Sequence, residues 1–137
     1  MPNSSLALQR AVRDALVADG MVTALLGGPH VHDHPPQGAG KPYLTVGDIE
    51  TRDWSTQSSR GHEHRMTVRA WSAAEGRRQA QILIDEIDRV LDGAPLVLEE
   101  HRLVNLSVVF WTVQRSAGGD AYEGIVRLRA VTEKEGE

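Results

Sequence analysis

The stretch from Glu63 to Gly93 constrains the fold most, because a strand pattern passes there directly into the strongest helical pattern of the chain. From Arg65 to Ser72 the residues alternate in character, with Met66, Val68 and Ala70 on one face, which is the period of a half-buried strand. After Gly76 apolar residues recur at helical spacing, at Ala80, Leu83, Ile84, Ile87, Val90 and Leu91. A strand and a helix joined by a short turn bury their apolar faces on each other, so this unit is the predicted core.

Both ends of that helix carry sequence signals. Ser72 stands three residues before Glu75, which is the spacing of a capping box. Gly93 and Pro95 follow the last apolar position and predict the end of the helix.

The first part of the chain predicts a helix capped by Ser4 or Ser5, with an apolar stripe at Leu8, Ala11, Val12, Ala15 and Leu16. A short helical turn is expected over residues 21–26. Residues 30–41 contain Pro and Gly at four positions and predict a loop, with room for a short strand around Val31. Residues 42–47 resume a strand.

The remaining residues predict further strands. Residues 96–98 read as a short strand, and residues 103–114 form a long β-prone run. Residues 122–132 alternate and follow a Gly-Gly turn, so the last two strands should pair as an antiparallel hairpin. The predicted fold is α+β, with a mainly antiparallel sheet and helices packed on one face. It forms a single domain over residues 1–137, in which residues 133–137 are a frayed tail.

Composition narrows the function classes. The chain has 137 residues, no cysteine and a net charge of −4. Disulfides, thiol nucleophiles and thiolate metal sites are therefore excluded, and affinity for nucleic-acid phosphates is not expected. No apolar run approaches the roughly 20 residues of a membrane span, and no secretory signal is visible, so no membrane partner is expected.

Five histidines form two clusters, His30/His32/His34 and His62/His64. Alternate residues of an extended chain point the same way, so the first three imidazoles could converge on one ion, with a carboxylate from Asp33 or Glu63. The Pro-Pro pair after His34 breaks that strand, and exposed histidines on loops explain the same pattern. No serine lies in a nucleophile turn, and no glycine pair matches a phosphate-binding loop. We therefore predict no catalytic residue, no cofactor and no metal.

A different kind of site is predicted on the polar segment 51–61. This segment is rich in Ser, Thr and Arg and carries one large apolar residue, Trp54, so it is expected to be a flexible arm or a long hairpin. Trp54 is a typical interface anchor, and Arg52 and Arg60 belong to a loose basic region that suits an acidic partner. Ile82 lies on the helix face opposite the apolar stripe. We expect it to join a subunit interface together with Trp54, or with whichever of Trp71 and Trp111 faces outward.

The chain resembles the tail-completion and tail-terminator proteins of long-tailed phages and gene transfer agents. The resemblance covers nearly the whole chain and rests on Leu8–Ala11, Asp19, Leu25–Gly28, His32–Gly38, Pro42–Gly47, the Trp54 loop, Val68, Trp71, Ser72, Gly76, Arg77 and Leu91. It implies a non-enzymatic virion protein, assembled in the bacterial cytoplasm and located at the tail-neck junction.

This resemblance implies a ring, commonly a hexamer, that caps the tail tube, ends tail polymerisation and joins the tail to the head. A head-to-tail interface closed at six copies is the symmetry such a ring needs. The implied partners are the tail-tube protein and a head-side neck protein, and DNA would pass through the channel without specific binding. Three alternatives stay open: a head-side connector or adaptor, a small His-dependent metal enzyme, and a binding module for a small ligand.

Overall fold

The computed structural model describes residues 3–38, 40, 42–73, 77–116, 118–119 and 121–135. Within these residues lie three helices, α1 (Ser4–Ala18), α2 (Gly20–Leu26) and α3 (Arg77–Leu91). The strands are β1 (Val31–His32), β2 (Tyr43–Asp53), β3 (Gly61–Ser72), β4 (His101–Arg115) and β5 (Tyr122–Lys134). None of the described helices is long and apolar enough to cross a membrane.

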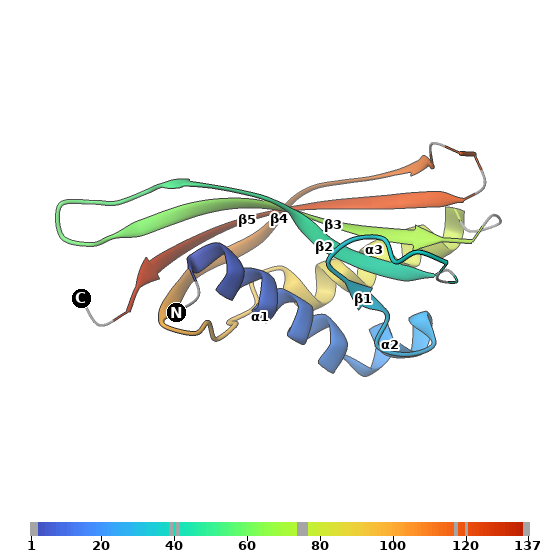
Figure 1. Cartoon of the computed structure of the whole chain (residues 1–137), viewed down its shortest axis with the longest axis horizontal. Helices are drawn as coiled ribbons and strands as arrows, with labels where there is room; N and C mark the ends of the chain where they lie inside the picture. The colour runs from blue at the N-terminus through green and yellow to red at the C-terminus, as the bar shows by residue number, and fades with distance from the viewer. Residues whose placement is uncertain are drawn as a thin grey trace.

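The five strands form one sheet in the order β1-β2-β3-β5-β4. Only β1 pairs in parallel with its neighbour, and the other three pairs are antiparallel. The helices lie on one face of the sheet, and the opposite face carries no helix (Figure 1). This arrangement confirms the predicted α+β class.

The core lies between the helices and the covered face of the sheet. Met66, Val68 and Ala70 of β3 share one buried cluster with the apolar stripe of α3, as their alternation and helical spacing predict. The helix approaches β5 closely at Gly124, where a Cβ atom would lie 3.0 Å from Cδ1 of Ile84. Glycine at this position therefore sets the distance between α3 and the sheet.

The helix ends differ in part from the sequence prediction. Asn3, and not Ser4 or Ser5, caps α1, because its side-chain oxygen accepts a hydrogen bond from Leu6 N–H at 2.8 Å. Glu75, the second member of the predicted capping box, lies outside the described residues. The Ser72 hydroxyl donates to the Tyr122 carbonyl at 3.0 Å. At the other end, Gly93 follows α3 with a φ of 71°, as expected for a glycine after a helix.

Two hairpins extend toward opposite ends of the molecule (Figure 1). One consists of β2 and β3, which are connected by residues 54–60, and the other consists of β4 (ending at Arg115) and β5 (beginning at Tyr122). We call the distal part of the first hairpin, residues 50–64, the arm. Residues 51–53 are strand, so the segment 51–61 is the tip of a hairpin, and its flexibility stays a prediction.

Two further expectations need correction. The short strand expected at residues 96–98 is reduced to an isolated bridge between Leu98 and His101. Residues 133 and 134, expected to belong to a frayed tail, are part of β5, and the Lys134 N–H donates to the Arg60 carbonyl at 3.0 Å.

Candidate functional site

A buried carboxylate lies at the base of the arm, on the face of the sheet without helices. Glu63 on β3 is only 2% exposed. It accepts a hydrogen bond from Nε of Arg52 on β2 at 2.5 Å and from Nε of Arg129 on β5 at 2.6 Å. The carboxylate therefore joins three adjacent strands, and its arginine partners more than compensate its negative charge.

The charge of Glu63 is fixed by these partners. Burial alone would raise the pKa of Glu63, but the hydrogen bonds from Arg129 and Arg52 outweigh burial and hold the pKa below its usual value. Glu63 is thus an anion at neutral pH, and it binds the guanidinium groups of Arg52 on the arm and of Arg129 on the neighbouring strand β5.

Trp54 is held by the same two arginines. The guanidinium carbon of Arg52 lies 5.5 Å from the centre of the Trp54 ring, and that of Arg129 lies 5.4 Å from it. These are cation–π distances. The ring stays 46% exposed, so the arm presents a large aromatic group whose position is already set before any partner binds. Such preorganisation lowers the entropy lost on binding.

On the opposite face of the sheet, a buried histidine links the two strands of the arm to β5. His64 has no exposed surface, and its ring nitrogens lie 2.8 Å from the Thr51 hydroxyl and 2.9 Å from the Thr132 hydroxyl. Burial, with the neighbouring His62 and His101, lowers the pKa of His64 to about 4. The ring is neutral at pH 7, so one nitrogen donates to one threonine and the other accepts from the second. The same three strands are therefore linked on both faces.

The structure separates the predicted interface residues into two groups. Arg52 and Trp54 lie together on the arm, and Arg60 is exposed in the connection at its tip. Ile82 is 38% exposed on α3, in the helix layer on the other side of the sheet. Trp111 is the second outward tryptophan, at 49% exposed. Trp71 is half-buried, and its indole N–H donates to the Thr45 hydroxyl at 3.2 Å.

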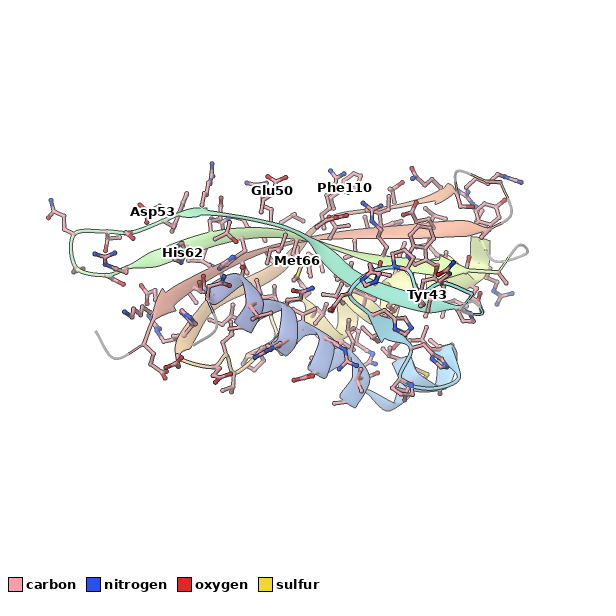
Figure 2. The ribbon with its side chains drawn as sticks, in the orientation of Figure 1. Tyr43, Glu50, Asp53, His62, Met66 and Phe110 are labelled. Carbon is pink, nitrogen blue, oxygen red and sulfur yellow. The ribbon has the colours of Figure 1, made fainter. Side chains whose placement is uncertain are left out.

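The two histidine clusters lie at opposite ends of the sheet. The His32 ring packs against Tyr43 with centroids 5.9 Å apart, whereas His62 lies on the arm, far from Tyr43 (Figure 2). The strand at Val31 ends at His32, so His34 does not continue it. Among the described residues, no three His, Asp or Glu side chains are placed to hold a metal ion.

Two features of the surface were not predicted. The sequence indicates Glu63 only as a possible metal ligand. Its contacts with two arginines depend on how β2, β3 and β5 are aligned with one another in the sheet. Val109 and Phe110 on β4 are 52% and 46% exposed. The apolar run at residues 108–111, longer than a half-buried strand needs, was the available signal for these exposed positions.

A hollow of about 320 Å³ lies on the face without helices. Charged groups of three strands line it, among them Glu50, Arg65 and Arg127. Its lining combines charges of both signs without a nucleophile next to a base, so the arrangement favours contact with another polar surface over catalysis.

Comparisons with known proteins agree with this reading. A family model described as "Tail completion protein gp17" matches residues 10–133. Among solved structures, the chain is similar to a chain of a structure titled "Virion of native gene transfer agent (GTA) particle", with 29% identity and a TM-score of 0.87 over 97% of this chain and 99% of that one. It is also similar to the gp17 protein of bacteriophage SPP1, with 25% identity and a TM-score of 0.65 over 93% of this chain and 89% of that one. A search of curated proteins found no match.

The family match covers nearly the whole chain, including both hairpins and all three helices except the start of α1. The chain therefore belongs to the tail completion protein gp17 family.

Proposed function

We propose that this protein is a structural component of a phage or phage-like virion, where it forms a ring of copies, six by expectation, at the end of the tail tube. The ring ends tail polymerisation and provides the surface to which the head is joined. The observation that carries this proposal is the similarity to a chain of a gene transfer agent virion over 97% of this protein.

The shape of the molecule supports a ring. A head-to-tail ring needs two different surfaces on each copy, whereas a two-fold dimer needs only one. The two hairpins reach toward opposite ends of the molecule, and the arm carries the exposed Trp54 (Figure 1). Each copy can therefore contact one neighbour with the arm and another with the opposite end.

The charge of the protein supports the passage of DNA through such a ring. The net charge is −4, and like charge opposes binding to phosphates. Several basic residues of the open sheet face have acidic partners: Arg52, Arg65 and Arg129 share Glu63, and Arg69 pairs with Asp48 and Glu123. DNA would then slide past without specific binding.

The test is the native mass of the purified protein over a concentration series, measured by light scattering, followed by electron microscopy of the largest species. A ring is expected alone or on addition of tail-tube protein, and it should bind the ends of isolated tubes. Monomers under all these conditions would overturn the proposal.

A head-side connector is the second candidate, because it belongs to the same class of neck proteins and would form a ring as well. The two differ in partner. A terminator binds tail-tube ends, and a connector binds head-side proteins in the absence of tubes. Pull-down with each purified partner therefore separates them.

A further inference from the structure

Two strand edges lack a strand partner. β4 is the last strand on one side of the sheet. On the other side, β1 covers β2 only at Leu44 and Thr45, so the arm half of β2 has no neighbour beyond it. Edge strands turn the N–H and C=O groups of alternate residues outward, where they can pair with another strand.

The loop after α3 covers the middle of the β4 edge. The Gly93 N–H donates to the Leu106 carbonyl at 2.8 Å, and the Val108 N–H donates to a carboxylate oxygen of Asp92 at 2.9 Å. Past this point the edge is uncovered. The Ser116 N–H donates inward to the Ala121 carbonyl. By alternation, Trp111, Val113 and Arg115 therefore turn their backbone groups outward.

The same alternation identifies which backbone N–H and C=O groups of β2 in the arm point away from β3. The Trp54 N–H donates inward to the Gly61 carbonyl, so Asp53 and Thr51 turn their backbone groups outward. In the part of the chain that the structure describes, no other backbone group bonds to these outward positions on either edge.

The side chains of the two edges are complementary. Val109, Phe110 and Trp111 are about half exposed, which is unusual for three consecutive apolar residues and is typical of a contact surface. In the uncovered part of β4, residues 109–115 include Arg115 and no acidic residue. In the arm part of β2, residues 50–53 include Glu50 and Asp53 against the single Arg52.

Figure 2 shows Glu50 and Phe110 on the same face of the sheet, the face without helices. The free edges lie on opposite sides of the sheet and toward opposite ends, so they cannot meet within one molecule. In a ring, the β4 edge of one copy can pair with the β2 edge of the next copy. Each copy then contacts one neighbour with each edge. The strand order makes β2 and β4 run in opposite directions, so the shared ladder is antiparallel.

We propose that neighbouring copies in the ring are joined by antiparallel pairing of β4 residues 109–115 of one copy with β2 residues 50–53 of the next. This inference rests on the proposed ring and names its interface. Within one molecule Thr51 is level with Leu106, through His64 and Ala130. Pairing near Val113 therefore displaces each copy by about 20 Å along the strands, at roughly 3.3 Å per residue. In a closed ring, such a stagger tilts the strands relative to the ring axis, as the strands of a closed barrel are tilted relative to the barrel axis.

The absence of cysteine in the natural chain allows a clean cross-linking test. Glu50→Cys and Gln114→Cys place one thiol on each free edge at exposed positions, which face each other when Thr51 pairs with Val113. A short bismaleimide tolerates a register that differs by a residue or two. The double variant is expected to give a ladder of covalent oligomers that ends at the ring number. A mixture of the two single variants should give dimers and nothing larger, because each copy then carries one thiol and can be cross-linked to only one neighbour.

The control is the pair Glu50→Cys with Asp88→Cys, in which the second thiol lies on the exposed side of α3 and no ladder is expected. Dimers from either single variant alone would indicate a two-fold contact and overturn the proposal. An oligomeric wild-type protein with no ladder from the double variant would overturn the edge pairing and leave the ring standing. A wild-type protein that is monomeric throughout, with no cross-links, would overturn both.

A second variant tests the backbone groups directly. Val113→Pro removes an outward N–H that no described residue uses within the chain. The Val113 side chain packs partly against the core, so Val113→Ala, which keeps the N–H, is the control and should still form the ring. The proline variant should keep the fold of the monomer. Loss of the ring with unchanged circular dichroism is expected, and a ring that persists in this variant would overturn the proposal.

Discussion

Glu63 and His64 are adjacent in the chain, and their side chains lie on opposite faces of the sheet with opposite electrostatic outcomes. Glu63 is buried beside two guanidinium groups and stays charged. His64 is buried beside two hydroxyl groups and stays neutral. The alternation of a strand gives each side chain its own surroundings, and those surroundings decide which charge can be buried.

His64 makes the stability of the fold depend on pH. Its folded pKa of about 4 lies below the ordinary value of 6.5, so the unfolded chain binds the proton more readily. The contribution of neutral His64 to stability is fully present above pH 6.5 and is lost as the pH drops toward 4. The free energy of unfolding should therefore fall by about 2 kcal/mol between pH 7 and pH 4.5. Urea unfolding at the two pH values measures this loss. His64→Gln keeps hydrogen-bonding groups without a titrating ring and should lose much less stability over the same interval. Equal losses in both proteins would contradict the prediction.

Glu63→Gln tests the arginine contacts. The neutral amide no longer balances Arg52 and Arg129, whose like charges then lie close together, so the arm should open more often. Hydrogen exchange should become faster in the arm amides and stay unchanged in α3. Glu50→Gln is the matched control, because Glu50 lies on the same face and has no ion-pair partner among the described residues. Equal effects of the two substitutions would show that the arginine contacts do not hold the arm.

At the scale of elements, α3 and β5 are fitted to each other at one glycine. A Cβ atom at Gly124 would lie 3.0 Å from both Cδ1 and Cγ1 of Ile84. Because Ile84 is itself buried, it cannot move aside freely.

Gly124→Ala should destabilise the protein by about 1–3 kcal/mol, the usual cost of overpacking a core. Thermal unfolding measures the change. Gly20→Ala is the control, because a Cβ atom at Gly20 meets no atom within 4 Å and α2 gains a better helix former. Adding Ile84→Val to Gly124→Ala should recover part of the loss. A stability unchanged by Gly124→Ala would mean that the helix shifts at little cost.

At the scale of the whole molecule, the sheet is longer than the helix layer that covers it, and the uncovered hairpins carry the exposed aromatic groups (Figure 1). Helices bury the middle of the sheet, while Trp54 and Trp111 stand outside the core at about half exposure. Assembly would bury these groups without disturbing the monomer.

Trp54→Ala should weaken assembly, or binding to tail-tube ends, by at least about tenfold, since truncating a central aromatic anchor commonly costs about 2 kcal/mol or more. Sedimentation or light scattering measures the shift in the association constant. Met21→Ala removes a comparably exposed apolar side chain, 55% exposed on α2, and should leave assembly unchanged. An unchanged association constant in Trp54→Ala would place the interface elsewhere.

The sequence by itself determined the elements that depend on local periodicity. The stripe from Ala80 to Leu91 predicted α3, the alternation around Met66 predicted the buried face of β3, and the Gly-Gly turn predicted the last hairpin. Family motifs spread over the chain also indicated a tail-completion protein, which the family match confirms. Such signals survive in the sequence because each depends on residues close together in the chain.

Only the tertiary structure decided the features that depend on register between distant strands. The pairing of Arg52 with Glu63, and the approach of Arg129 across 66 positions of sequence, give the arm its buried charge. The bulge between Val108 and Phe110 shifts the alternation of β4 by one residue and so decides which side chains of the apolar run face solvent. No local pattern records a register, because it is set by the packing of all five strands together.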